Sequence, residues 1–265
     1  MITTPRVSIL IVTYNREAFL PLAVRSVLSQ SYEDFELLIL DDASTDRSPE
    51  AIAELFTDRR ITYVKHARNL GINANRNAGL ALAKGDYVAM LDSDDVWLDP
   101  SKLQQQVDLL DGDRHCGLVG THAKVLDGAG KVIGELTPET DPAAIRNRML
   151  MRNQFVQSSV LIRRRVLDRA GWYDVTIPIW EDYELLLRMG QSSTLRNIPR
   201  MLTGYRCHTG NISRAAQRKS LASYWQIYRR YRGQYPHGYL LWLKTSLLTC
   251  RYHWRHPLEG LRGAG

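Results

Sequence analysis

Three carboxylates follow a short apolar run near the middle of the chain. The run, Tyr87 to Leu91, has the length and composition of a buried strand. Asp92, Asp94 and Asp95 come directly after it. Carboxylates this close repel one another unless a cation or solvent offsets their charge, and oxygen ligands suit a hard divalent ion such as Mg²⁺ or Mn²⁺. The spacing therefore predicts a metal site. The alternative is an acidic turn in which Asp92 or Asp95 caps the next helix.

Polar clusters also follow two earlier apolar runs. They are Thr13-Tyr14-Asn15-Arg16 after the run 7–12, and Asp41-Asp42 after the run 35–40. The carboxyl ends of parallel strands meet at one edge of a sheet, where open α/β sheets bind ligands. The three clusters together therefore predict a single ligand-binding edge. The alternative for Asp42 is a helix cap, and the alternative for Tyr14 is an aromatic side chain packed in a loop.

The loop after the first apolar run differs from those of common nucleotide-binding motifs. It holds no Gly-rich phosphate loop, and no Walker-type loop occurs elsewhere in the sequence. A nucleotide bound at this edge would be held mainly by side chains and a metal. The same absence counts against a nucleotidyltransferase, which would usually carry a Gly-rich, basic loop for the triphosphate.

Strand and helix patterns alternate along the chain. In the first half we expect strands at 7–12, 35–40, 61–64 and 87–91, and helices at 18–29, 48–56 and 73–84. In the second half we expect helices at 98–110, 141–152, 163–171 and 181–189, and strands at 116–120, 123–126, 131–133 and 157–162. The alternation predicts an α/β protein with a doubly wound, mostly parallel sheet flanked by helices.

Length and composition are those of a soluble globular protein with one large or two small domains. The cysteines, Cys116, Cys207 and Cys250, are odd in number and widely spaced, which indicates a reducing compartment and no paired zinc ligands. The N-terminus runs straight into a strand, so we expect no signal peptide. No apolar run approaches the roughly 20 residues of a membrane span. These features predict a cytoplasmic protein.

Positive charge is concentrated at the C-terminal end. Residues 216–265 carry nine lysines and arginines against one acid, whereas residues 1–215 are close to neutral. The segment also holds nine aromatic residues. Basic residues among Trp, Tyr and Leu are typical of a helix that lies on an anionic membrane, so one hypothesis places the segment on the inner face of the membrane. The alternative is a pair of helices that packs on the body. Nucleic-acid binding fits the charge, but no nucleic-acid motif supports it.

A set of short motifs resembles a known family. They are 8–16, 24–32, 41–46, 68–71 with 74–79, 85–87 with 92–95, and Trp180-Glu181-Asp182. In this order and spacing they resemble the family 2 glycosyltransferases of the GT-A fold, over about residues 7–213. The resemblance implies a GT-A domain with a nucleotide-sugar-binding half at 1–115 and an acceptor half at 116–215. Residues 216–265 would form a basic, aromatic helical extension.

The resemblance implies a role for each residue of the donor side. The implied donor-binding residues are Thr13, Tyr14, Asn15, Asp42, Arg76, Asp92, Ser93 and Arg206. Thr13, Tyr14 and Asp42 would hold the base and ribose. A carboxylate such as Asp42 can accept the N3–H of uracil, which favours a UDP-sugar. Arg76 and Arg206 would offset the diphosphate charge, although Arg76 could also be a solvated helix arginine.

The same resemblance implies the metal ligands and the catalytic pair. Asp94, Asp92 and His208 would hold Mn²⁺ or Mg²⁺, with Asp94 as the direct ligand. The metal would stabilise charge on the leaving diphosphate. Asp182 would be the base that deprotonates the acceptor hydroxyl, and Glu181 would orient it or bind the acceptor. The alternative for this pair is two acids favoured at a helix N-terminus by the helix dipole.

The sequence therefore predicts an inverting, metal-dependent hexosyl or N-acetylhexosaminyl transferase. Its donor would be a nucleoside-diphosphate sugar, and its acceptor a saccharide or a lipid-linked saccharide in cell-surface polysaccharide synthesis. The alternative is a non-catalytic nucleotide-sugar-binding or scaffold protein of the same fold. The sugar, the linkage and the oligomeric state are not encoded in these motifs.

Overall fold

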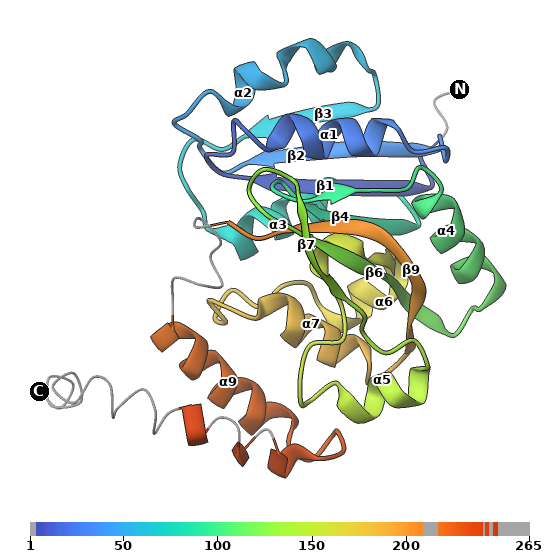
Figure 1. The fold of residues 1–265 in the computed structure, drawn as a ribbon, viewed down its shortest axis with the longest axis vertical. Coiled ribbons are helices and arrows are strands. Elements are labelled where there is room, and N and C mark those ends of the chain that lie inside the picture. Colours follow the sequence, from blue (N-terminus) through green and yellow to red (C-terminus); the bar gives the residue numbers. More distant parts are fainter. Residues whose placement is uncertain (1–3, 209–216, 241, 244–245, 249–265) are drawn as a thin grey trace, which may run out of the picture.

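The computed structural model describes residues 4–208, 217–240, 242–243 and 246–248. Its centre is a nine-stranded sheet in the order β3-β2-β1-β4-β8-β6-β9-β5, with β7 paired to β6 (Figure 1). The strands are β1 Val7–Thr13, β2 Phe35–Asp41, β3 Ile61–Lys65, β4 Tyr87–Asp92, β5 Val96–Trp97, β6 Cys116–Leu126, β7 Val132–Leu136, β8 Leu161–Arg163 and β9 Thr194–Arg206.

The first four long strands form the parallel part of the sheet. β1 lies between β2 and β4, in register Thr13 to Asp41 and Val12 to Asp92. The polar clusters after these strands therefore meet at one edge, as the sequence predicts. All residues of β1 are buried. A parallel strand that is covered on both faces has a nearly continuous apolar sequence, which explains the apolar run at 7–12.

Helices cover both faces of this sheet. They are α1 Leu20–Leu28, α2 Ser48–Ala51, α3 Ile72–Leu82, α4 Lys102–Gly112, α5 Pro142–Arg148, α6 Arg164–Ala170, α7 Glu181–Met189 and α9 Gln217–Tyr231, with 3₁₀ turns at Ala53–Thr57 and Gln157–Ser159. Successive residues of β1 pack to opposite sides: Ile9 joins the core under α1 and α4, and Leu10 joins the core that holds residues of α3, α6 and α7.

The second half of the chain differs from its sequence pattern in three places. The strands expected at 116–120 and 123–126 are one continuous strand, β6. The strand expected at 157–162 begins as a 3₁₀ turn, and only Leu161–Arg163 pairs in the sheet. β9 was not expected, because Arg196, Pro199 and Arg200 interrupt its apolar alternation. It pairs in parallel with β6 through several register shifts.

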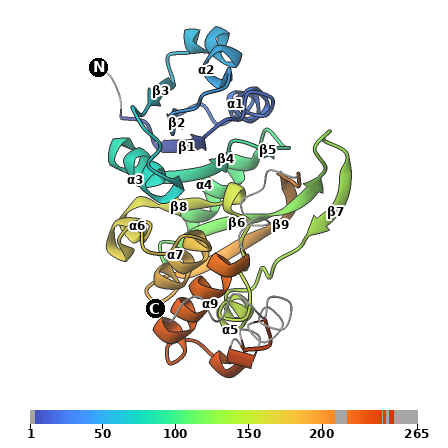
Figure 2. The same ribbon diagram turned by 90° about the vertical axis from the view of Figure 1, so that its left-hand side faces the viewer.

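The start of the C-terminal segment packs on the body. Helix α9 lies beside α7 in both ribbon views (Figures 1 and 2). Ile227, Tyr231 and Tyr235 are buried in the core that also holds α7 residues. For this part, packing on the body is the alternative that the structure supports. The remainder, Leu241, Lys244, Thr245 and residues 249–265, lies outside the described residues. Among the described helices, none is both long and apolar enough to span a membrane.

Candidate active site

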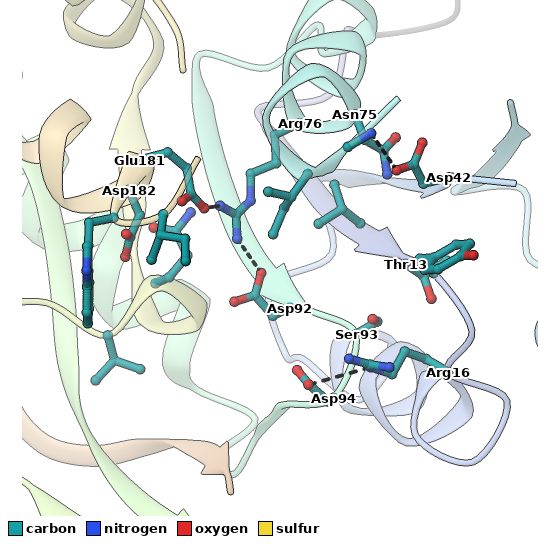
Figure 3. A pocket seen from close by; sticks show the side chains of 18 of the residues that line it. Thr13, Arg16, Asp42, Asn75, Arg76, Asp92, Ser93, Asp94, Glu181 and Asp182 are labelled. Atoms are coloured by element: carbon teal, nitrogen blue, oxygen red, sulfur yellow. Dashed lines mark hydrogen bonds and ion pairs between the residues drawn. The ribbon is translucent and has the colours of Figure 1, made fainter. Parts of the chain in front are cut away.

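A cavity of about 730 Å³ opens at the carboxyl edge of the parallel strands. Figure 3 shows Thr13 and Asp42 on one side of it and Glu181 and Asp182, at the start of α7, on the other. Residues that line the donor side are Thr13, Tyr14, Arg16, Asp42, Asn69, Arg76, Asp92, Ser93 and Asp94. The predicted base and most predicted donor residues therefore share one cavity, although they come from distant parts of the sequence.

Asp42 is buried at the end of the cavity. Its carboxylate accepts hydrogen bonds from the backbone N–H groups of Leu70, at 2.7 Å, and Gly71, at 2.9 Å. These bonds hold the loop that leads into α3. The helix-cap alternative is not realised, because neither α2 nor α3 begins with a side-chain cap hydrogen bond. A carboxylate has about four acceptor positions, so capacity remains for a donor group from the cavity.

Thr13 and Asn15 differ in what their side chains do. The Thr13 hydroxyl lines the cavity, and it is buried without a hydrogen-bond partner among the described residues. Such a group is available to a ligand. The Asn15 carboxamide instead accepts from the backbone N–H of Thr45 at 2.8 Å, and Asn15 has φ of 53°. Its side chain ties two loops together, and its predicted contact with the donor stays a prediction.

The three clustered carboxylates point to three different partners. Asp92 accepts from Arg76 at 2.7 Å. Asp94 lies 2.9 Å from the His208 ring nitrogen and 3.6 Å from Arg16. Asp95 is buried and accepts from the Ser158 hydroxyl and, at 2.7 Å, from the Arg206 backbone N–H. The cluster is thus not a single three-carboxylate site.

Asp95 braces the fold beside the site. Burial, followed by the nearby charges of Asp94 and Asp92, raises the pKa of Asp95 well above its usual range. Its bonds join the turn after β4 to the 3₁₀ turn at 157–159 and to the end of β9. The capping alternative does not hold for Asp95, because α4 begins only at Lys102.

The residues expected to hold a metal are partly assembled. Asp94 and His208 are in contact, whereas Asp92 is paired with Arg76. Within the described ranges, no group of three or more His, Cys, Asp or Glu side chains gathers around one point. Mg²⁺ and its analogues commonly use one or two carboxylates and complete their shell with phosphate oxygens and water. The donor set at Asp94 therefore fits a metal that arrives with a diphosphate.

Arg76 connects the two sides of the cavity. It is 2% exposed, and its guanidinium donates to Asp92 and to Glu181. Burial lowers the pKa of Arg76, but the carboxylates of Asp92 and Glu181 outweigh burial and raise it. The alternative of a solvated helix arginine is therefore wrong. Its buried Nε has no hydrogen-bond partner among the described residues.

Asp182 has the environment of a base that works near neutral pH. Burial and then the neighbouring Glu181 carboxylate raise the pKa of Asp182 to about 7, although Arg76 opposes the rise. The Asn153 amide donates to the Asp182 carboxylate at 3.3 Å. A base with a pKa near the working pH combines a useful ionised fraction with a strong drive to take a proton.

Arg206 holds the turn that carries Asp94. Among the described residues that line the cavity, Arg206 is absent. Its buried guanidinium donates to the backbone carbonyls of Asp94, at 2.9 Å, and Asp127, at 3.2 Å. These bonds fix the turn at Asp94, and the predicted contact of Arg206 with phosphates stays a prediction.

Several cavity residues were not singled out from the sequence, among them Arg16, Trp180 and Asn153. Arg16 and Trp180 belong to two of the family motifs, 8–16 and 180–182, so the neighbouring motif residues could have pointed to them. Asn153 stands in a segment without any chemical pattern, and only the fold brings it to Asp182.

Comparison with known proteins identifies the family. The model of the family described as glycosyl transferase family 2 matches residues 8–169. An uncharacterised glycosyltransferase of Methanocaldococcus jannaschii is 30% identical over 69% of this chain and 64% of its own length. The Escherichia coli UDP-Glc:alpha-D-GlcNAc-diphosphoundecaprenol beta-1,3-glucosyltransferase WfaP is 32% identical over 78% of this chain and 79% of its own. The chain thus spans about two thirds to four fifths of these two relatives.

Solved structures share the fold. S. aureus TarS in complex with UDP-GlcNAc has a TM-score of 0.69 and 16% identity, over 84% of this chain and 66% of the solved one. The mannosyltransferase PcManGT from Pyrobaculum calidifontis, in complex with GDP-Man and Mn²⁺, has a TM-score of 0.68 and 19% identity, over 100% and 77%. These likenesses confirm the predicted GT-A fold. With the family match over most of the chain, they show that this protein belongs to glycosyltransferase family 2.

Proposed function

We propose that the chain transfers a sugar from a nucleoside-diphosphate sugar, first of all a UDP-sugar, to a saccharide or lipid-linked saccharide, with inversion. The observation that carries the proposal is the single cavity that holds Asp42 and Asp94 on one side and Asp182 on the other. The donor binds at the first side, and the acceptor hydroxyl approaches from the second.

The donor side fits a nucleoside diphosphate. Thr13 offers a buried hydroxyl without a partner among the described residues, and Asp42 retains acceptor capacity beside it. Both suit hydrogen bonds to a pyrimidine or ribose. Arg16 and Arg76 bring positive charge to the cavity wall. WfaP, by its name, uses UDP-Glc, and TarS was solved with UDP-GlcNAc, which supports UDP as the first donor to test.

Asp94 and His208 would hold a divalent metal, with Asp92 next to them. Such an ion, when bound, stabilises negative charge on the departing diphosphate. PcManGT was solved with Mn²⁺, which supports Mn²⁺ or Mg²⁺ as the ion. Arg16 lies 3.6 Å from Asp94, so it can contribute positive charge at the same place.

Asp182 takes the proton in the reaction. The acceptor oxygen forms a bond to the anomeric carbon while the bond from that carbon to the diphosphate oxygen breaks. The acceptor proton passes to the Asp182 carboxylate, and the nucleoside diphosphate leaves with the bonding electrons. A single displacement of this kind inverts the anomeric carbon. Glu181 remains paired with Arg76, so its part is to position its neighbour.

The relatives also support a setting. WfaP, by its name, acts on an undecaprenol-linked sugar. We infer a similar lipid-linked acceptor for this chain, in cell-surface polysaccharide synthesis, with the protein in the cytoplasm and its basic C-terminal segment against the inner face of the membrane. Nine basic residues against one acid in residues 216–265 support that placement.

Calorimetry of nucleotide binding tests the donor side. UDP and GDP are titrated into the full chain with MnCl₂ and with a chelator. UDP should bind with Mn²⁺ and bind much more weakly, or not at all, after chelation. Failure of both nucleotides to bind with Mn²⁺ would contradict the proposal. UDP binding of equal affinity with and without the chelator would contradict the metal requirement but would still support the donor pocket.

An Asp182→Asn variant separates an enzyme from a non-catalytic scaffold. The amide keeps the shape of the side chain but cannot take a proton. UDP affinity should stay unchanged, while turnover of the UDP-sugar falls about 10²–10⁴-fold. Asp168→Asn, an exposed ion-pair partner on α6, is the matched control and should be as active as the wild type. Equal turnover in both variants would exclude Asp182 as the base.

A further inference from the structure

The acceptor side of the cavity has a lining unlike that of the donor side. Around Asp182 it is mostly apolar, with Leu136, Phe155, Val156, Ile179 and Trp180. A mostly apolar pocket with a few placed polar groups is typical of a site for a small organic ring. The polar groups here are the Asp182 carboxylate and the Asn153 amide. Given the proposed function, on which this inference rests, the ring is a sugar of the acceptor.

Trp180 is held in an unusual backbone conformation. Its φ of 68° and ψ of 25° lie in the left-handed region, which a bulky residue rarely adopts. It stands immediately before Glu181 and Asp182, and its side chain lines the cavity. Strained backbone of this kind persists where the surrounding structure fixes it, commonly at a ligand site. Here the strain fixes an indole ring next to the base.

Helix α9 supports this indole from outside the cavity. The Tyr224 ring lies 5.4 Å from the Trp180 ring, tilted by 35°. Farther along α9, Tyr231 and Arg230 bond to Glu184, which is fully buried in α7; the Arg230 contact is 2.6 Å. These bonds lock α9 against the helix that carries Asp182. The position of the indole is therefore fixed by two helices.

We propose that Trp180, supported by Tyr224, is the aromatic platform that binds the acceptor pyranose ring. The face of a pyranose that carries its axial C–H groups is apolar and packs on an aromatic ring, while its hydroxyl groups remain at the edge. Packing on Trp180 brings one hydroxyl to the Asp182 carboxylate beside it. Because α9 lies outside the matched residues 8–169, acceptor choice depends partly on a segment outside the common family core.

Saturation-transfer NMR tests the platform. The probes are the methyl glycosides of glucose, galactose, mannose and N-acetylglucosamine, each added to the full chain with UDP and MgCl₂, because Mg²⁺ is diamagnetic and leaves the proton signals sharp. Irradiation of aromatic protons should transfer saturation to the C–H face of at least one glycoside. Trp180→Leu, which keeps bulk without a ring, should weaken the affinity for that glycoside about tenfold, which is about 1.4 kcal/mol. Trp180→Phe should stay within about threefold of the wild type.

Two controls separate this inference from the proposed function. Trp172→Leu removes a tryptophan outside the described cavity lining and should bind like the wild type. UDP affinity, measured by calorimetry, should be the same in all variants. The platform would be wrong if none of the four glycosides received saturation, or if Trp180→Leu and the wild type bound the glycoside equally well. In either case, unchanged UDP binding would still support the proposed donor side. Loss of UDP binding in Trp180→Leu would also overturn it, because the ring would then support the fold.

Discussion

The carboxylate proposed as the base, Asp182, has neighbours that shift its pKa in opposite directions. Burial and Glu181 raise the pKa of Asp182, and Arg76 lowers it. Arg76 in turn is paired with both Asp92 and Glu181. The guanidinium thus links a donor-side carboxylate to an acceptor-side carboxylate through two hydrogen bonds. Changes on either side should therefore alter the ionisation of Asp182.

The pH profile of transfer should show this tuning. Asp182 is protonated below its pKa of about 7 and can act as a base only above it, so kcat/KM should rise through a limb near pH 7. Glu181→Gln removes a negative charge that raises the pKa of Asp182. It also frees the Arg76 guanidinium from Glu181, so that its positive charge lowers the pKa of Asp182 further. The limb should therefore move to lower pH, as measured by UDP release across pH 5 to 9.

An exposed carboxylate gives the matched control for this shift. Glu54→Gln breaks a surface pair with Arg25 and should leave the limb unchanged. A limb that stays in place in Glu181→Gln, or moves to higher pH, would contradict the account of Asp182.

The placement of a residue in the cavity was predictable where its type has few uses at its position. Asp42 and Asp94 follow strand ends, and Asp182 lies at a helix start. Spacing and resemblance therefore predicted that these residues share one site, and the structure places them around one cavity. Arg206 and Asn15 were not predictable in the same way. Their side chains bond to the backbone of loops distant in sequence, Asp127 in one case and Thr45 in the other. Such contacts leave no local pattern.

At the scale of elements, strands with continuous apolar runs were predictable and interrupted ones were not. β1, β2 and β4 are buried on both faces, so nothing breaks their pattern. β9 alternates irregularly because it shifts register three times against β6. Its end nevertheless places Arg206 against the turn that carries Asp94 and, two residues later, brings His208 to the Asp94 carboxylate. The element that was missed therefore completes the site.

The contact between α7 and α9 should contribute measurably to stability. Glu184 is fully buried, and Tyr231 donates its hydroxyl to it. Tyr231→Phe removes that donor and leaves the buried carboxylate with fewer partners. We expect the free energy of unfolding, measured in urea, to fall by about 1–3 kcal/mol.

A neighbouring tyrosine on the same helix gives the control. Tyr228 packs, partly buried, against the same core, and its hydroxyl forms no hydrogen bond within the described residues. Tyr228→Phe should change the free energy of unfolding by less than about 0.5 kcal/mol. Equal effects of the two substitutions would show that the hydroxyl bond to Glu184 does not fix α9.

At the scale of the molecule, one sheet runs through both halves. β4 and β8 pair across the boundary that the sequence suggested at residue 115, and the cavity opens where the halves join. The two-half division therefore remains a proposal about function within a continuous sheet. The charge, in contrast, is segregated along the chain, because residues 216–265 carry the excess of basic groups.

This segregation predicts membrane binding that depends on the end of the chain. Beyond α9, apolar side chains are exposed, with Trp242 at 44% and Leu247 at 70%, in a segment rich in basic residues. The full chain should therefore co-sediment with phosphatidylglycerol vesicles at low salt and less at 0.5 M salt, since salt screens the attraction.

Replacing Trp242 and Leu247 by Ser should reduce binding severalfold at either salt concentration. The same replacement of Leu22 and Phe56, which are exposed on the donor half, should not. Equal vesicle binding by the two double variants would show that charge alone attracts the chain, and it would contradict a contribution of Trp242 and Leu247.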